Sequence, residues 1–132
     1  MVQDQDRRAG NAVLILHPHP ESVGVARRFV AEVCIASRTV PTLCESAVLL
    51  ASEIVTNAFI HGRSDARIAV AASHNQVRVE VADDNSRHPR RLEPDADALD
   101  GRGLAIVDLV AASWGVRDDS IGKTVWFEVT VG

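Results

Sequence analysis

Hydrophobic residues between positions 43 and 62 recur at steps of three and four, and they define the central element of the chain. The apolar positions are Leu43, Ala47, Leu50, Ile54 and Ala58. This spacing places them along one stripe of an α-helix, which predicts a buried helix. Pro41 followed by Thr42 and Glu45 resembles a capping box at its start. Gly62 is suited to a left-handed cap at its end.

Three polar residues interrupt this stripe at steps of four, namely Glu53, Asn57 and His61. Residues four apart on a helix project in nearly the same direction, so the three side chains form one polar edge. A carboxylate, an amide and an imidazole on an apolar helix need either water or a ligand. By itself, the spacing favours a polar edge that contacts water. The other motifs of the chain shift the interpretation toward a ligand-binding edge.

Shorter patterns predict the remaining elements. In chain order they are a strand at 11–16, a helix at 21–38, strands at 68–72 and 77–81, a helix at 104–112 and strands at 114–117 and 124–131. The segment 73–76 joins the two middle strands as a β-hairpin. Alternation places two sets of residues each on a single face: Val77, Val79 and Val81, and in the last strand Val125, Phe127, Val129 and Val131.

The order of these elements predicts an α+β fold. We expect a two-layer sandwich in which three helices cover one face of a mixed, mostly antiparallel sheet. Residues 1–10 are charged and predict a flexible N-terminal tail, and residues 11–132 form a single domain. The segment 83–100 has no apolar period, and a loop of this length in a small domain is typically functional or mobile.

Composition excludes several classes of protein. The chain has 132 residues, of which 46% are hydrophobic and 24% charged, as in ordinary globular proteins. A net charge of −4 argues against direct nucleic-acid binding, because no basic excess neutralises phosphates. No apolar run is long enough to span a membrane and the first residues are too polar for a signal peptide, so we expect a cytoplasmic protein.

Cysteines and histidines give no metal-binding pattern. Cys34 and Cys44 are the only cysteines, and we expect both to be reduced thiols in the core. His17 and His19 alternate with prolines, which is typical of a loop rather than a metal site.

Three distant segments carry polar residues that could meet in one cleft: the polar edge of the central helix, a strand end at Asp83, and Gly101-Arg102-Gly103 before the short helix. A glycine-flanked helix start exposes N–H groups suited to phosphate, although a simple tight turn explains it equally well. The Asp83 carboxylate could accept a hydrogen bond from the edge of a nucleotide base, although aspartate is also common in turns. An asparagine carbonyl is a suitable anchor for hydrated Mg²⁺.

In this order the segments resemble four motifs of the GHKL (Bergerat-fold) ATP-binding superfamily. Residues 53–62 match its N-box, 81–85 with Pro89 its first glycine box, 101–107 its second, and 114–116 with 122–128 its closing hairpin. The resemblance covers about residues 11–131 and is closest to the small anti-sigma factor serine kinases of actinobacterial type. One departure is that Asp83 is followed by Asp84-Asn85-Ser86, where the superfamily commonly has glycines.

The resemblance implies roles for the matching residues. Glu53 would act as general base on the attacking hydroxyl, and Asn57 would ligate Mg²⁺. Asp83 would accept a hydrogen bond from the adenine amino group, assisted directly or through water by Thr124. The other nucleotide-binding positions would be Asn85, Gly101, Arg102, Gly103 and Leu104. Arg27 lies where the family's first helix touches protein partners, and a solvated position is the alternative.

The implied function is that of an ATP- and Mg²⁺-dependent serine/threonine protein kinase that also serves as an anti-sigma factor. Its implied partners are an anti-anti-sigma (STAS-type) protein with an acceptor serine, an RNA polymerase sigma factor and a second copy of the chain in a homodimer. The main alternative is a catalytically weak module of the same fold that binds partners according to nucleotide. A histidine-kinase catalytic fragment and a nucleotide-free fold used only for protein contacts are further alternatives.

Overall fold

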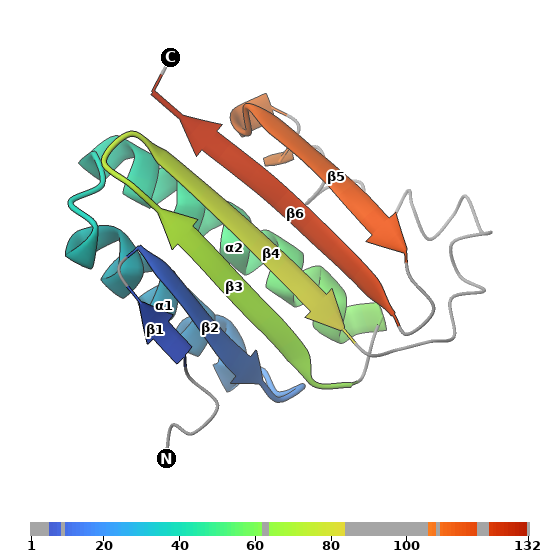
Figure 1. The fold of residues 1–132 in the computed structure, drawn as a ribbon. Helices are drawn as coiled ribbons and strands as arrows, with labels where there is room; N and C mark the ends of the chain where they lie inside the picture. The colour runs from blue at the N-terminus through green and yellow to red at the C-terminus, as the bar shows by residue number, and fades with distance from the viewer. Residues whose placement is uncertain are drawn as a thin grey trace.

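Two helices cover one face of a six-stranded sheet (Figure 1). The computed structural model describes residues 6–8, 10–61, 64–83, 106–107, 109–118 and 122–131. The helices are α1 (Glu21–Ala36) and α2 (Pro41–His61). The strands are β1 (Asp6–Arg8), β2 (Asn11–Leu16), β3 (Ala66–Ala72), β4 (Gln76–Asp83), β5 (Ser113–Asp118) and β6 (Lys123–Thr130). This architecture confirms the predicted two-layer α+β class.

The sheet has the strand order β1-β2-β3-β4-β6-β5, and every pairing between described strands is antiparallel. The expectation of a mixed sheet is therefore wrong for the described strands. Short turns join β1 to β2, β3 to β4 and β5 to β6, and such connections return the chain in the opposite direction. Two helices, rather than one, separate β2 from β3, so these neighbours are antiparallel as well.

Residues 6–8, part of the segment predicted to be a flexible tail, form strand β1. Strand β1 pairs with the start of β2, with Asp6 opposite Val13 and Arg8 opposite Asn11. Gly10 makes the turn between them with a φ of 79°, a conformation that glycine adopts without strain. The Gly10 carbonyl accepts a hydrogen bond of 2.7 Å from the Ala72 N–H, which ties the turn to β3.

The helices begin and end close to the predicted positions. Helix α1 ends two residues before Arg38, whose φ of 57° is left-handed and stops the helical backbone. The capping box predicted for α2 is wrong, because α2 begins at Pro41 and the Val40 carbonyl already accepts the Cys44 N–H at 3.0 Å. Proline suits the first helical position since no intrahelical partner is needed for its missing N–H.

The third predicted helix is only partly described. Residues 106–107 and 109–110 are helical, and residues 104–105 and 108 lie outside the described part of the chain. The expectation of three helices is therefore not matched, because the described residues form two full helices, α1 and α2. Gly62, the predicted end of the central helix, also lies outside the described residues.

The core fills the space between the helices and the sheet. The predicted stripe of α2 is buried at Ala47, Leu50 and Ile54, and the predicted faces of the strands are buried at Val77, Val79, Val81, Phe127 and Val129. Val131 lies beyond the end of β6 and is exposed, so the buried face of the last strand stops at Val129. Burial of this kind is the main stabilising contribution to the fold.

The opposite face of the sheet carries a cluster of charged side chains, as alternation predicts for Arg78 and Glu80. The Arg78 guanidinium donates to Glu80 Oε2 at 2.9 Å and to Glu128 Oε2 at 2.8 Å. The same guanidinium stacks over the Trp126 ring, 4.3 Å from its centroid. Each of the three charged side chains is about one-third exposed, so these contacts contribute more than fully exposed ion pairs do.

Candidate functional site

Helix α2 and strand β4 bring two of the predicted motifs to the same end of the molecule. Helix α2 packs directly on β4 and β6, and Figure 1 shows its C-terminal end beside the C-terminal end of β4. Asn57 lies in the last turns of α2, and Asp83 is the last residue of β4. The structure therefore places the amide-bearing helix and the carboxylate-bearing strand end together, as a shared cleft requires.

Asp83 lies at the buried edge of this region. Its neighbours across the sheet are Ala66 on β3 and Lys123 on β6. Because side chains alternate along a strand, Asp83 shares the helix-facing side with Val81. Its side chain is only 7% exposed, which favours a defined hydrogen-bond donor over bulk water. Asp83 thus meets the burial expected of a carboxylate that recognises one group of a bound ligand.

Thr124 is brought near Asp83 in the sheet but not onto the same face. It pairs with Ala82, one position before Asp83, and is 5% exposed. By alternation, Thr124 belongs to the face that also carries Glu80 and Trp126. Assistance to adenine recognition therefore stays a prediction for Thr124, and the register favours its contribution through water or the backbone over direct side-chain contact.

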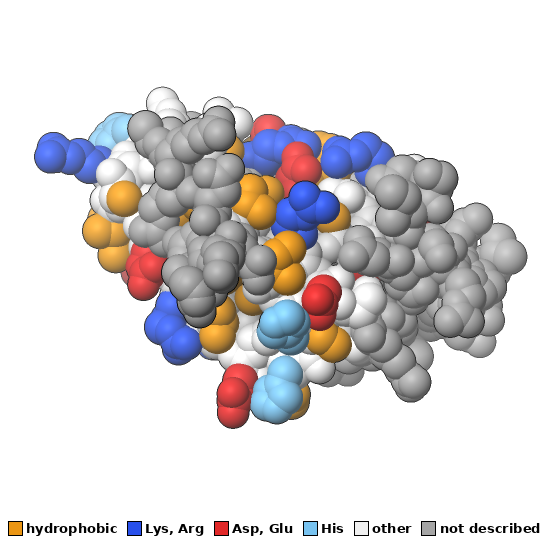
Figure 2. Space-filling view, turned by 60° about the horizontal axis from the view of Figure 1, so that its bottom comes forward, with side chains coloured by type: hydrophobic (Ala, Val, Ile, Leu, Met, Phe, Trp, Pro, Cys, Tyr) orange, Lys and Arg blue, Asp and Glu red, His pale blue; other side chains and the backbone are white. Residues whose placement is uncertain are grey.

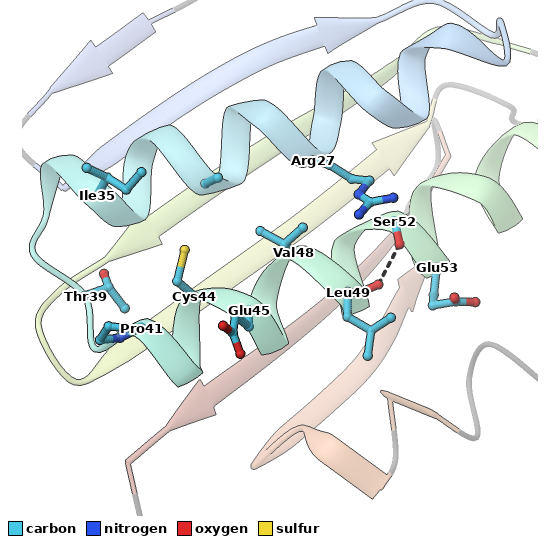
Figure 3. A pocket seen from close by; sticks show the side chains of 11 residues that line it. Arg27, Ile35, Thr39, Pro41, Cys44, Glu45, Val48, Leu49, Ser52 and Glu53 are labelled. Carbon is cyan, nitrogen blue, oxygen red and sulfur yellow. Dashed lines mark hydrogen bonds between the residues drawn. The ribbon is translucent and has the colours of Figure 1, made fainter.

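Glu53 and Asn57 are both half-buried on α2, one helical turn apart. In Figure 3, Glu53 and Leu49 project from α2 away from α1. His61 is the last residue of α2, and its side chain lies outside the described part of the structure. The predicted polar edge is thus described at two of its three positions, and neither of them is fully exposed to solvent.

The remaining nucleotide-binding predictions lie outside the described residues, namely Asn85, Gly101, Arg102, Gly103 and Leu104. Two residues further along are described: Val107 is fully buried in the core, and Ile106 packs against it. This burial anchors the start of the predicted third helix to the same core as α2 and β4.

A groove of about 720 Å³ runs between α1 and α2, on their side away from the sheet (Figure 3). Arg27 projects from α1 toward Ser52 at one end, and Thr39 and Pro41 lie at the other end. Apolar side chains line most of it, among them Ile35, which is 73% exposed. The sequence analysis did not predict this groove. The available signal was that Ile35 and Leu49 are hydrophobic residues off the buried stripes of their helices.

The histidines near the start of α1 contact polar groups of the protein. His17 Nδ1 lies 3.0 Å from Asp65 Oδ1, with both side chains well exposed, and His19 Nδ1 accepts the Glu21 N–H at 3.1 Å. Within the described ranges, no group of three or more His, Cys, Asp or Glu side chains could hold a metal ion. The magnesium site predicted at Asn57 stays a prediction, and this cation commonly takes further ligands from phosphate and water.

Surface charge is mixed where it is described. On the face shown in Figure 2, acidic and basic side chains are interspersed among hydrophobic ones rather than gathered by sign. A search of the described residues for a helix long and apolar enough to traverse a bilayer finds none.

The family model for the histidine kinase-like ATPase domain matches residues 16–129, nearly the whole chain. The protein therefore belongs to the histidine kinase-like ATPase family, whose members are built around an ATP-binding domain. No curated protein matches the chain. Family membership confirms the superfamily identified from the four sequence motifs and supports nucleotide binding.

Proposed function

We propose that this protein is an ATP-dependent serine kinase that acts on a STAS-type anti-anti-sigma protein and sequesters an RNA polymerase sigma factor. Family membership supports the ATP-binding part of this proposal. The observation that carries it is the position of Asp83, a carboxylate that is 7% exposed where β4 ends beside α2. The protein-kinase and anti-sigma parts rest on the resemblance of the ordered motifs.

Each residue in the proposed site has a chemical task suited to its side chain. Asp83 accepts a hydrogen bond from the adenine amino group. Asn57 holds Mg²⁺ through its side-chain oxygen, and the ion, when bound, neutralises charge on the phosphates. Glu53 lies one turn from Asn57 and accepts the proton of the attacking serine hydroxyl. Phosphoryl transfer depends mostly on positioning and charge neutralisation, so a small set of groups is sufficient.

Nucleotide binding is tested by titration with a fluorescent ATP analogue. In Asp83→Asn, the side chain presents either an NH₂ donor or a neutral carbonyl oxygen to the adenine amino group. Either way, the charged acceptor is lost. A hydrogen bond to a charged group contributes about 1.5–3 kcal/mol, so we expect an affinity loss of about 10- to 100-fold. Asp118→Asn, on the exposed strand β5, is the matched control and should bind like the parent. Equal affinity in all three proteins would remove the proposed pocket.

Kinase activity is tested separately, with the cognate STAS protein and Mg·ATP. Glu53→Gln keeps the size of the side chain and removes its basicity, so phosphoserine formation should fall by about 10²- to 10⁴-fold while nucleotide affinity is kept. Glu32→Gln, on the exposed side of α1, is the control. Loss of activity in both variants, or in neither, would contradict the assignment of Glu53.

The second candidate function is a nucleotide-dependent binding module without catalysis. The groove between α1 and α2 favours this alternative, because Arg27 and exposed apolar side chains there suit a protein contact. Nucleotide-dependent capture of the sigma factor without any phosphoserine in the STAS protein would select the module. Substitution Arg27→Ala should weaken capture in either case.

A further inference from the structure

Two thiols of unequal exposure lie at the bend between α1 and α2. Cys34 is in the last turn of α1 and is fully buried, whereas Cys44 is in the first turn of α2 and is only partly buried. Figure 3 shows the Cys44 sulfur in the wall of the groove between the helices. The expectation of two core thiols is thus confirmed for Cys34, whereas Cys44 borders the groove. Both cysteines are free.

The bend holds the two cysteines in a fixed relation. The Thr39 N–H donates to the Cys34 carbonyl at 2.9 Å, and the Cys44 N–H donates to the Val40 carbonyl at 3.0 Å. Thr39 is itself fastened to the sheet, because its hydroxyl donates to the Ser73 carbonyl at 2.8 Å. Thr39 and Val40 are consecutive, and each is hydrogen-bonded to the backbone of one cysteine. The two cysteines therefore have little freedom to move apart.

The thiols are also neighbours in space. Burial is the main cause that raises the pKa of the Cys34 thiol to about 12, and the adjacent Cys44 side chain contributes to this rise. The groove gives a small solute access to Cys44, while Cys34 is shielded behind it. One thiol is thus placed to meet an oxidant and the other to react with the first.

We propose that Cys44 and Cys34 form an oxidation-sensitive dithiol that hydrogen peroxide converts into an intramolecular disulfide. The Cys44 thiolate attacks one peroxide oxygen, the O–O bond breaks, and a sulfenic acid and hydroxide form. The Cys34 sulfur then attacks the Cys44 sulfur, the S–O bond breaks, and the Cys34 proton leaves with the hydroxyl group as water. Each disulfide thus consumes one peroxide and releases two water molecules in total.

Formation of the disulfide changes the groove wall, because it joins the Cys44 sulfur to Cys34 of α1. The dithiol itself contains no residue of the proposed nucleotide site, and the groove that Cys44 borders is also lined by Glu53. Disulfides in reducing compartments are generally transient and redox-sensing, and a partly exposed cysteine beside a resolving cysteine is the arrangement that such sensors use.

The experiment uses the full chain, first reduced and then treated with hydrogen peroxide, with free thiols counted after denaturation and intact mass measured. The wild type should lose both thiols, lose the mass of two hydrogens, stay monomeric by non-reducing electrophoresis and recover with dithiothreitol. Cys34→Ser should lose its one thiol and gain oxygen, while Cys44→Ser should keep its buried thiol at least tenfold longer. Oxidation of the wild type should accelerate with pH, because the first step is attack on peroxide by a thiolate.

Cys34→Ala serves as the second variant if Cys34→Ser does not fold, since it introduces no buried hydroxyl. A wild type that only gains oxygen, or that cross-links only between chains, would overturn the proposal. Equal oxidation kinetics and products in the wild type and in the Cys34 variants would overturn it as well.

Discussion

Replacing Gly115 by alanine should destabilise the protein through one identified steric conflict. A Cβ at this position would lie 2.9 Å from Trp126 Nε1 and 3.1 Å from both Cε2 and Cζ2. Ordinary contacts begin near 3.4 Å, so a rigid ring must move by about half an ångström. That ring also carries the Arg78 guanidinium at 4.3 Å, and its displacement weakens the cation–π contact.

The magnitude follows from these contacts. Overpacking of this kind costs about 1–3 kcal/mol, and disturbing the cation–π contact adds about 0.5 kcal/mol. The lower backbone entropy of alanine in the unfolded chain offsets about 0.4–1 kcal/mol. The net loss is about 0.5–3 kcal/mol, which for a chain of 132 residues lowers Tm by about 2–11 °C.

Gly24→Ala is the matched control, because the same chemical change there should have the opposite sign. A Cβ at Gly24 would meet only Arg28 Nη1, at 3.8 Å, and the position is inside α1. Removal of a helical glycine should stabilise by about 0.5–1 kcal/mol and raise Tm by about 2–4 °C. Thermal unfolding followed by circular dichroism measures both variants under identical conditions.

Trp126→Leu and Gly115→Ala together form a double-mutant cycle that tests this explanation. In this background the ring is gone, so the Gly115→Ala penalty should shrink to about 0.5 kcal/mol or less. An unchanged penalty in that background, or a Gly115→Ala protein as stable as the parent, would refute the steric explanation.

Three further predictions concern the sheet and the core. Gly10→Ala should lower stability by about 1–3 kcal/mol and reduce hydrogen-exchange protection in β1 and β2, because φ is 79° and the new Cβ lies 2.9 Å from the Ala72 carbonyl oxygen. Arg78→Met should cost about 1–2 kcal/mol in urea unfolding, less at high salt. With the Cys34 pKa raised from 9.0 to about 12, stability should hold below pH 9 and fall above it, and Cys34→Ala should remove this slope in unfolding titrations.

Much of the fold could be predicted because the spacing of hydrophobic residues along a segment indicates a helix or a strand. Val77, Val79 and Val81 alternate strictly, and the structure buries all three. The helix stripe through Leu50 and Ile54 was equally clear, because three- and four-residue steps match the turn of an α-helix. Patterns of this kind show which side of an element is buried without any knowledge of its neighbours.

What the sequence did not show depends on contacts between distant residues. Strand β1 has only three residues, and its pairing depends on the turn at Gly10 and on the hydrogen bond from Ala72. The start of α2 was misassigned because Thr42 and Glu45 fit a capping box, yet Pro41 takes the first helical position. A segment considered by itself shows neither the geometry of the turn at Gly10 nor that α2 begins at Pro41, before the predicted capping box.

The candidate site divides in the same way. Residue types and their order singled out Asp83 and Asn57 as candidates, but only the packing of α2 on β4 brings their elements to one end of the molecule. The groove beside Arg27 could not be predicted, because a cavity arises from the gap between two helices and belongs to neither one. The face of Thr124 likewise depends on strand register, which one sequence does not specify.

The arrangement of the strands also bears on how the chain folds. Strands β3 and β4 are adjacent in sequence and joined by a short turn. Strands β2 and β3 are also neighbours in the sheet, but both helices separate them in the sequence. Closing a long loop carries an entropy cost that a hairpin avoids. We therefore expect the β3–β4 hairpin to be formed early along the folding pathway and β2 to dock late, so that destabilising substitutions in β2 mainly accelerate unfolding while those in the hairpin mainly slow refolding.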